Sequence, residues 1–504
     1  MLYRLTKIRA HTMRTRHIRP TGTATKEERH LNLLEWMQYI RGKKCAVVGL
    51  GISNRPLIGF LLMRGAIVVA RDKKTREEIG EYADEIEKQG ATLKLGENYL
   101  DDLDEEIIFR SPGLRPDIPA FAEAVARGAV LTSEMELFFE LTPATVIGIT
   151  GSDGKTTSTT LTGLILSQEY KNDEGTRIFV GGNIGTPLLP MVADMTERDF
   201  AVVELSSFQL QGAMRSPHVT VITNVTPNHL NWHTDMEEYT AAKTNAFRHE
   251  PCRRVVLNAE NAITAEMGNT ANVPITYFSS LKESHTEFSL REGDSAVYVR
   301  EGKIYLWSDG AEREIMQAAQ LLLRGRHNLE NLMAAISLTF EYASAESVRE
   351  VATTFTGVKH RMEPVRVSGG VTYYDSSIDS TPVRTAAVLS AMPTKPIIIC
   401  GGYDKRIPFE PLADAICEYA KAVVLTGATA GKILTALSKK VEVQEGRMPI
   451  YLQPDFTEAV KLACTVAQPG DAVLLSPACA SFDAFKNFEE RGRVFKDIVN
   501  SLAD

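Results

Sequence analysis

The segment from Val146 to Thr160 has the sequence VIGITGSDGKTTSTT, in which an apolar run is followed by small and hydroxyl residues around a single lysine. A strand, a glycine turn and a helix in this order form a phosphate cradle, because backbone N–H groups and the helix N-terminus attract anions. We expect the N–H groups of Gly151 to Gly154 to face phosphate, Lys155 to reach the β and γ phosphates, and Thr156 to bind Mg²⁺. The strict spacing requires glycine where Ile149 stands, so the loop is a variant, and a chance match is the alternative.

Three further residues have the chemistry of metal ligands. Glu204 follows the apolar run FAVV, and a carboxylate at the end of a buried strand is costly unless a cation compensates it. His229 lies in TPNHLNWH after another apolar run. Lys243 lies on a predicted helix, MEEYTAAKTNAF, among small and apolar residues that would leave its ammonium poorly solvated. Taken singly, Glu204 could instead face solvent, and His229 could cap a turn.

A second glycine turn, CAVVGLGISN, precedes the first by about a hundred residues. Asp72 ends the following apolar run, where the acid of a dinucleotide-binding fold holds ribose hydroxyls. Asn54 stands in place of the third glycine of that fingerprint, so by itself the turn is a weak indication of NAD binding. The alternative is an ordinary tight turn followed by a surface acid.

These residues are set among apolar runs of four to eight residues that alternate with helical patterns from residue 44 onward. Such alternation predicts an α/β fold with parallel sheets covered by helices. Between about 275 and 312 the pattern changes to one that predicts a small antiparallel patch. Proline and glycine punctuation places domain boundaries near 141 and 358, which gives domains at 41–140, 141–358 and 359–504.

The composition excludes several classes of protein. With 504 residues, 44% hydrophobic and 24% charged, the chain has the make-up of a large soluble protein, and its net charge of −8 argues against nucleic-acid binding. The six scattered cysteines do not form a secreted disulfide framework. No apolar run is long enough to span a membrane. We expect residues 1–40, whose first part is basic, to be a partly disordered extension.

The motifs together resemble a known family, the Mur ligases, over about residues 44–504. The resemblance is carried by TGSDGKTT, GGNIG (181–185), ELSSFQL, NVTPNHLNWH, AAK, GRHNLEN (325–331) and SPACASFDAFKNFEERG (476–492). It implies an N-terminal Rossmann-like domain that binds a UDP-sugar, a central ATPase domain, and a C-terminal Rossmann-like domain that binds an amino acid. The two glycine turns would then hold two different nucleotides, a UDP-linked acceptor and ATP.

The resemblance also implies roles for individual residues. Catalytic roles fall to Lys155, Asn183, His229 and Lys243. ATP contacts fall to Gly151, Ser152, Asp153, Gly154, Lys155, Thr156, Thr157, Asn328, Asn331, His360 and Arg361. Contacts to the UDP substrate fall to Gly51, Ile52, Ser53, Asp72, Lys73, Ser111, Pro112 and Gly113. D-glutamate contacts fall to Ser380, Lys405, Ser481 and Phe488, and two Mg²⁺ ions are assigned to Thr156 with Glu204 and to His229 with a carbamylated Lys243.

The implied reaction is the ATP-dependent addition of D-glutamate to UDP-N-acetylmuramoyl-L-alanine, a step of peptidoglycan precursor synthesis. We therefore expect a cytoplasmic, monomeric enzyme that does not bind nucleic acid or insert into a membrane. The alternatives are a Mur-type or folylpolyglutamate-type ligase for another amino acid, a non-catalytic nucleotide-sugar binder, and an NAD oxidoreductase, which would leave the GKT loop unexplained. The DNPR motif of the diaminopimelate- and lysine-adding ligases is absent.

The chain departs from the family pattern at several positions near these sites. Asn228 and Asn231 stand where aspartates are usual, which removes negative charge beside the second metal. Ser376 stands where many members have aspartate, with Asp375 one place earlier, and Ile378 stands where some have lysine. The contacts around 375–381 are therefore open.

Overall fold

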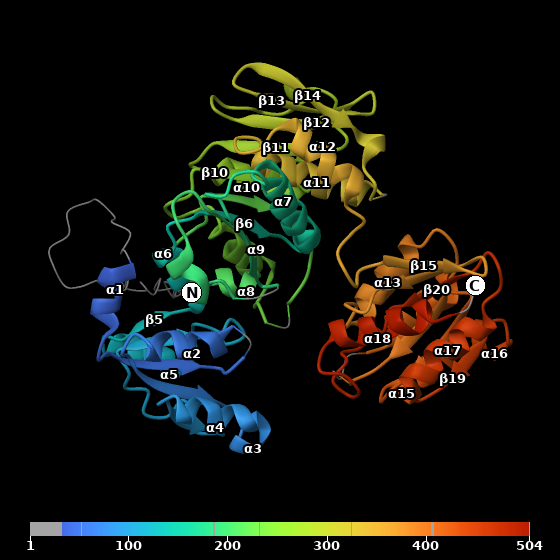
Figure 1. Cartoon of the computed structure of the whole chain (residues 1–504), viewed down its shortest axis with the longest axis horizontal. Helices are drawn as coiled ribbons and strands as arrows, with labels where there is room; N and C mark the ends of the chain where they lie inside the picture. The colour runs from blue at the N-terminus through green and yellow to red at the C-terminus, as the bar shows by residue number, and fades with distance from the viewer. Residues whose placement is uncertain are drawn as a thin grey trace, which may run out of the picture. The chain divides into compact units, whose positions relative to one another are not determined.

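The computed structural model describes residues 33–51, 53–184, 187–230, 232–323, 325–404 and 408–502 (Figure 1). The chain divides into two compact units, Met1–Phe355 and Thr356–Asp504. The division falls close to the boundary predicted at 358. The predicted α/β class is confirmed, with two sheets in the first unit and one in the second. Within the described part of the chain, every helix is too short or too polar to cross a bilayer.

The first sheet has five parallel strands in the order β3-β2-β1-β4-β5. Its strands are β1 (Lys44–Val48), β2 (Ile67–Asp72), β3 (Thr92–Leu95), β4 (Ile107–Arg110) and β5 (Val130–Thr132). The chain runs outward from β1 to β3 and then returns to add β4 on the other side of β1. Ligands of open parallel sheets bind at such a reversal, beyond the carboxyl ends of the strands. The helices of this part are α2 (Asn54–Leu62), α3 (Arg76–Ile79), α4 (Glu81–Lys88), α5 (Pro119–Ala126) and α6 (Glu134–Leu141).

The prediction of an extension up to residue 40 is wrong for its last part. Residues Leu33–Ile40 form helix α1, and the Trp36 side chain is fully buried. Its ring centre lies 5.6 Å from that of Phe60 on α2. Because burial of a tryptophan removes a large apolar area from water, α1 is part of the folded unit. Residues 1–32, which include the basic stretch, lie outside the described residues.

The central sheet has nine strands in the order β14-β13-β12-β11-β10-β9-β6-β8-β7. They are β6 (Thr145–Thr150), β7 (Ile178–Gly182), β8 (Phe200–Glu204), β9 (Val219–Ile222), β10 (Arg254–Asn258), β11 (Ile275–Ser279), β12 (Ser295–Arg300), β13 (Lys303–Ser308) and β14 (Ala311–Gln317). The antiparallel patch is confirmed but is smaller than expected. It comprises β12 to β14, whereas β11 pairs in parallel with both of its neighbours.

Helices flank this sheet and place its loops. They are α7 (Lys155–Glu169), α8 (Ser207–Leu210), α9 (Met236–Thr244), α10 (Ala262–Met267), α11 (Arg326–Thr339) and α12 (Ala345–Thr354), with short 3₁₀ turns η1 (Leu189–Asp194), η2 (Gly268–Thr270), η3 (His285–Glu287) and η4 (Ala318–Gln320). Helix α7 packs against α11 in the drawing (Figure 1). Leu161 and Ile165 of α7 share a buried cluster with Leu332 and Ile336 of α11. This apolar contact holds α7 against α11. Helix α7 begins at Lys155, after the loop that follows β6.

The second unit is a six-stranded sheet in the order β15-β16-β20-β17-β18-β19, in which β15 alone is antiparallel to its neighbour. Its strands are β15 (Glu363–Ser368), β16 (Val371–Asp375), β17 (Ile397–Gly401), β18 (Ala422–Thr426), β19 (Ile450–Leu452) and β20 (Ala472–Leu475). Its helices are α13 (Pro382–Ala391), α14 (Glu410–Tyr419), α15 (Ala430–Leu437), α16 (Val441–Gln444), α17 (Phe456–Val466) and α18 (Phe488–Asn500). Two separate apolar clusters form its core.

The two ends of the second unit are bonded to each other. Arg366 on β15 donates from Nη1 to the carbonyl oxygens of Asn500 and Leu502, both at 2.9 Å. Lys496 on α18 lies 2.6 Å from a carboxylate oxygen of Glu363, also on β15. The last helix is therefore held against the first strand.

Candidate active site

The loop between β6 and α7 has the geometry of a phosphate cradle. Gly151 and Gly154 have φ angles of 146° and 80°, values that side chains rarely adopt. A Cβ atom on Gly151 would lie 1.9 Å from Oγ1 of Thr223, and one on Gly154 would lie 2.3 Å from Oδ1 of Asn331. Both positions therefore require glycine. The predicted strand, turn and helix are present, and α7 begins at Lys155.

Two of the N–H groups expected to face phosphate are instead bonded within the protein. Ser152 N–H donates to the Asn224 carbonyl oxygen, and Asp153 N–H donates to Oδ1 of Asn224, both at 2.9 Å. The prediction that the N–H groups of all residues from Gly151 to Gly154 face phosphate is therefore wrong for Ser152 and Asp153 in this structure. They tie the loop to the segment that follows β9, and the phosphate-facing role of Gly151, Gly154 and the first turn of α7 stays a prediction.

Three residues predicted for metal binding and catalysis meet at one carboxylate. Thr156 Oγ1 donates to Oε2 of Glu204 at 2.8 Å, and Asn183 Nδ2 donates to Oε1 of Glu204 at 2.9 Å. Glu204 ends β8 and is 2% exposed, so it does not face solvent. Both donors are neutral and leave the negative charge unbalanced. A hydroxyl beside a buried carboxylate at a phosphate loop fits Mg²⁺, which prefers oxygen ligands.

Lys155 and Lys243 converge on the phosphate loop. Lys155 Nζ donates to the carbonyl oxygens of Gly151 and Ser152 at 3.1 and 2.9 Å. Lys243 Nζ, on α9, also donates to the Gly151 carbonyl, at 2.9 Å, and to Oγ1 of Thr150 at 3.3 Å. Lys243 is 1% exposed, and this burial, reinforced by the charge of Lys155, lowers its pKa well below the ordinary value. Burial therefore disfavours the charged form of the Lys243 amine.

His229 lies on an exposed turn. Its φ angle is 56°, and its ring centre lies 4.9 Å from that of Phe208. Its backbone N–H donates to Oδ1 of Asn228 at 2.9 Å. The described contacts of His229 and Lys243 involve different groups, so their pairing at a second metal stays a prediction. Asn231 lies outside the described residues.

The first glycine turn and the 111–113 loop meet at the reversal point of the first sheet. A Cβ atom on Gly49 would lie 2.6 Å from Cβ of Ser111. Asp72 accepts the N–H of Leu50 at 2.6 Å and that of Lys74 at 2.9 Å, and only 9% of it is exposed. Asp72 is therefore not a surface acid, and its carboxylate stabilises the glycine turn through the bond from Leu50. Lys73 is exposed, and Ile52 lies outside the described residues.

Asn54 is a residue whose role the sequence prediction missed. Its Nδ2 donates to the carbonyl oxygens of Val48 and Gly49 at 3.2 and 2.9 Å, and its side chain is buried. The amide thus pins the end of β1 to the start of α2. The signal was present, because Asn54 occupies the position of the third fingerprint glycine.

Asn328 and Asn331 lie at the N-terminal end of α11. Asn331 is 7% exposed, its Oδ1 accepts the Ser158 hydroxyl at 3.3 Å, and its Nδ2 donates to Oδ1 of Asn328 at 3.4 Å. Asn331 therefore packs against the phosphate loop from the N-terminal end of α11. A direct contact between either asparagine and the nucleotide base stays a prediction.

In the second unit His360 is held by two acids. Its Nδ1 lies 2.7 Å from Oδ2 of Asp375, and its backbone N–H donates to Glu363 Oε2 at 2.7 Å. These three side chains offer ligand atoms within 4.8 Å of one another. The Lys496 ammonium lies 2.6 Å from Glu363 and 3.6 Å from Asp375 and neutralises the acids, so we assign no metal here.

Of the predicted D-glutamate contacts, Ser481 lies in the loop that precedes α18, Phe488 begins α18, and Ser380 lies just before α13. Ser481 is buried, the Phe488 ring centre lies 6.0 Å from that of His360, and Lys405 lies outside the described residues. Arg491, which the sequence prediction missed, donates to the carbonyl oxygens of Cys479 and Ala480, both at 3.1 Å. It fixes the backbone next to Ser481.

Asp379 is a third missed residue, and it bears on the departure at Ser376. Its Oδ2 accepts the Ser476 hydroxyl at 2.9 Å, it is hydrogen-bonded to the side chain of Ser376, and its burial raises its pKa. Ser376 also accepts the N–H of Met362 at 3.0 Å. A carboxyl group is thus present beside Ser376 although the aspartate is three residues further along the chain.

Comparison with known proteins agrees with this arrangement. A model of the Mur ligase middle domain matches residues 149–339, and a model of the Mur ligase, glutamate ligase domain matches residues 360–479. The UDP-N-acetylmuramoylalanine--D-glutamate ligase of Clostridium novyi (strain NT) is 46% identical over 470 residues, which cover 93% of this chain and 99% of that protein. The protein of the same name from Clostridium botulinum (strain Langeland) is 45% identical over 473 residues, 94% of this chain and 99% of its own. The chain belongs to the Mur ligase family.

Solved structures share the fold of this Mur ligase. A murein peptide ligase from Psychrobacter arcticus is 15% identical with a TM-score of 0.50, over 92% of this chain and all (100%) of that one. MurF from Acinetobacter baumannii is 16% identical with a TM-score of 0.52, over 75% of this chain and 87% of its own. The family is ATP-dependent, and the loop from Gly151 to Thr156 lies within the part of the chain that matches the middle domain.

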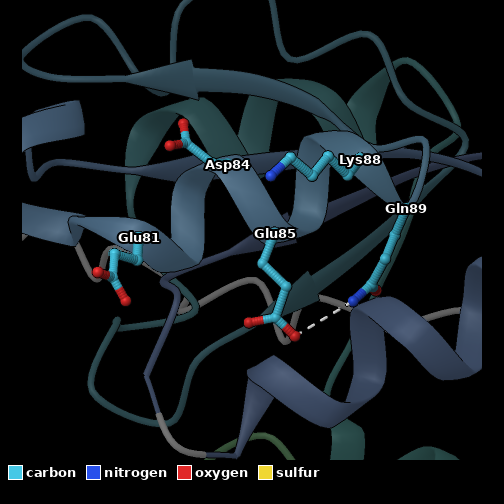
Figure 2. A pocket seen from close by; sticks show the side chains of 5 residues that line it. All are labelled: Glu81, Asp84, Glu85, Lys88 and Gln89. Carbon is cyan, nitrogen blue, oxygen red and sulfur yellow. Dashed lines mark hydrogen bonds between the residues drawn. The ribbon is translucent and has the colours of Figure 1, made fainter.

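A hollow elsewhere on this Mur ligase is lined by other residues. Figure 2 shows Glu81, Asp84, Glu85, Lys88 and Gln89 along and just after α4, with Gln89 Nε2 donating to Oε1 of Glu85 at 3.4 Å. None of the predicted site residues is among them. A cluster of acids on one short helix is an ordinary solvated surface, and we assign no ligand to it.

Proposed function

We propose that this chain catalyses the ATP-dependent addition of D-glutamate to UDP-N-acetylmuramoyl-L-alanine, with ADP and phosphate as the other products. The observation that carries this proposal is the 46% identity over 93% of the chain to a ligase of that name. In this proposal residues 41–140 bind the UDP-sugar, 141–358 bind ATP and 359–504 bind D-glutamate. The monomeric state and the cytoplasmic location stay predictions.

The first step is a phosphoryl transfer. A carboxylate oxygen of the acceptor attacks the γ-phosphorus of ATP, the bond to the bridging oxygen breaks, and ADP leaves with that electron pair. The acceptor then carries an acyl phosphate. Lys155 and the first turn of α7 offset the charge of the phosphates, while Gly154 lets the backbone approach them.

Two Mg²⁺ ions would supply the remaining positive charge. Thr156 and Glu204, joined at 2.8 Å, would hold one, and His229 with Lys243 would hold the other. Lys243 is suited to carbamylation, because its buried amine has a lowered pKa and its neutral form takes up CO₂. The product is an anionic oxygen ligand in place of a cation. Asn183 orients Glu204 through its amide.

The second step forms the amide. The amine nitrogen of D-glutamate attacks the acyl carbon, the carbon–oxygen bond to phosphate breaks, and the nitrogen releases a proton. Ser481 is placed on a loop that Arg491 fixes, and Phe488 begins α18 nearby in the chain. Serine hydroxyls and the Lys405 ammonium have the chemistry that recognises a dicarboxylate. Ser380 is proposed to contribute a further hydroxyl.

The test is the release of ADP from purified full-length protein. ADP should form with UDP-N-acetylmuramoyl-L-alanine and D-glutamate together, and not when either is omitted. L-glutamate and meso-diaminopimelate should be poor substitutes. Equal turnover with meso-diaminopimelate would assign the chain to another ligase activity, and binding of the acceptor without ADP release would identify a non-catalytic binder. Lys155→Ala should abolish turnover while the melting temperature is retained, because Lys155 is half-buried, donates to the Gly151 and Ser152 carbonyls and is not part of the apolar core.

A further inference from the structure

Two loops of the first unit, far apart in sequence, are hydrogen-bonded to each other in both directions. Trp232 Nε1 donates to the carbonyl oxygen of Gly113 at 3.1 Å, and Arg115 Nη1 donates to the carbonyl oxygen of Trp232 at 2.8 Å. The Arg115 guanidinium carbon also lies 5.3 Å from the centre of the Trp232 ring. Two opposed bonds and a ring contact fix both the spacing and the orientation of the loops.

Arg115 is itself held rigidly. Its Nη1 and Nη2 donate to the two carboxylate oxygens of Glu238 at 3.0 and 2.8 Å, and Asp117 receives a second pair of bonds at 2.9 and 2.8 Å. The bond from Arg115 lowers the pKa of Glu238 to about 2, so the pair stays ionised at neutral pH. Glu238 lies on α9, the helix that also carries Lys243.

Trp232 is connected to His229 by two routes. The Trp232 N–H donates to the His229 carbonyl oxygen at 2.9 Å. The Trp232 ring centre lies 4.6 Å from that of Phe208, which lies 4.9 Å from the His229 ring centre. Phe208 is on α8, immediately after the strand that ends in Glu204. Trp232 therefore joins the 111–113 loop to the turn that carries His229.

We propose that Trp232 is a positioning residue that couples binding of the nucleotide-linked acceptor at the 111–113 loop to placement of His229 for Mg²⁺. This inference rests on the proposed function, which gives the acceptor to that loop and a metal to His229. Trp232 touches neither reacting atom and acts through Gly113 on one side and His229 on the other. Occupation of the loop by the acceptor then tightens Mg²⁺ binding, and by thermodynamic reciprocity Mg²⁺ tightens acceptor binding by the same factor.

Trp232→Phe is the sharpest variant, because phenylalanine keeps a ring against Phe208 but lacks the indole N–H that bonds Gly113. Arg115→Lys is the second variant; it keeps the charge but loses the forked geometry that reaches Trp232 and Glu238 together. Trp307→Phe is the matched control. Trp307 is on β13, where its ring stacks on His285 at 3.7 Å between ring centres.

The measurement is the calorimetric Kd of UDP-N-acetylmuramoyl-L-alanine for the full-length protein without ATP, at zero and at saturating Mg²⁺. We expect Mg²⁺ to tighten acceptor binding at least about fivefold in the parent and in Trp307→Phe. The factor should fall towards one in Trp232→Phe and in Arg115→Lys. Melting temperatures identify a variant that fails to fold, and the other variant then decides the result.

The outcomes separate this inference from the proposed function. A parent that does not bind the acceptor overturns both. A parent that releases ADP but shows no Mg²⁺ coupling, or the same coupling in both variants, overturns the positioning role alone. Acceptor-dependent quenching of tryptophan fluorescence that is lost in Trp232→Phe and kept in Trp307→Phe would independently place the acceptor beside Trp232. Equal quenching in both variants would contradict that placement.

Discussion

The hydroxyl of Thr156 donates to the carboxylate of Glu204 at 2.8 Å, and the two residues come from the start of α7 and the end of β8. The contact joins the phosphate loop to the adjacent strand at a buried position. The Glu204 carboxylate is 2% exposed and its bonds from Thr156 and Asn183 come from neutral groups, so a bound cation would compensate its buried charge.

Glu204→Gln should therefore separate stability from activity. Removal of the buried charge should leave the melting temperature without Mg²⁺ unchanged or higher, because glutamine can still accept from Thr156. Turnover should fall by about 10²–10³-fold, since the first metal loses its carboxylate. Thr156→Ser, which keeps the hydroxyl, should retain most activity, whereas Thr156→Val should behave like Glu204→Gln. Undiminished ADP release in Glu204→Gln would remove Glu204 from the metal site.

Lys243→Ala should lose most activity and recover part of it with acetate or formate. The carbamate proposed for Lys243 is an anionic oxygen group, and Lys243 itself is only 1% exposed. A small carboxylate can occupy the space that the truncated side chain vacates. Methylamine should have no effect. Lys155→Ala is the control, because its lost group is a cation and acetate should not rescue it. Rescue of Lys243→Ala by methylamine and not by acetate would show that Lys243 acts as an ammonium.

Asn228→Asp should lower the Mg²⁺ concentration that gives half-maximal activity. Asn228 is next to His229, and its Oδ1 already accepts the His229 N–H, so an added charge there is held close to the proposed second metal. Asn269→Asp, at an exposed position in η2, controls for the change in net charge. Coincident Mg²⁺ titrations for the parent and Asn228→Asp would contradict the effect assigned to this departure.

Glu134→Gln should flatten part of the pH dependence of stability. Glu134 accepts the N–H of Leu189, is 4% exposed, and burial raises its pKa from 4.5 to about 7. The folded state then holds a proton that the unfolded state has lost. This contribution is complete below pH 4.5 and disappears as the pH rises to about 7, at most about 3 kcal/mol for this shift.

The measurement is the temperature of the first unfolding transition, determined at a series of pH values from 4.5 to 8. The parent should lose stability over the lower part of this range more steeply than Glu134→Gln. Glu266→Gln, at an exposed position on α10, should follow the parent. Parallel curves for all three proteins would show that Glu134 does not titrate in this window.

The sequence predicts those parts of the site that depend on local order. A strand, a glycine turn and a helix specify the loop at Gly151 and Gly154, and Glu204 could be placed because parallel strands end at one edge of a sheet. Contacts between distant segments have no such signal. The bond from Trp232 to Gly113 and the carboxyl of Asp379 beside Ser376 depend on loop paths that no periodicity encodes.

Helix α1 and the phosphate loop show the same distinction. Trp36 belongs to the core, but the short helix around it follows a basic stretch and carries too little periodic pattern to be separated from an extension. The hydrogen bonds from the Ser152 and Asp153 N–H groups to Asn224 could likewise not be predicted from the sequence. Each N–H could donate either to a phosphate or to the protein, and the sequence pattern does not distinguish these acceptors.

The bonds from Arg366 to the carbonyls of Asn500 and Leu502 mean that the second unit begins and ends at the same place. The two units are joined near Thr356, at the same side of the second unit as its last residues. A compact unit whose ends lie close together can be exchanged as a whole between proteins. In the proposed function the second unit binds the amine, whereas Thr156, Glu204 and Asn183 lie in the first, so amino-acid specificity and phosphate chemistry can evolve separately.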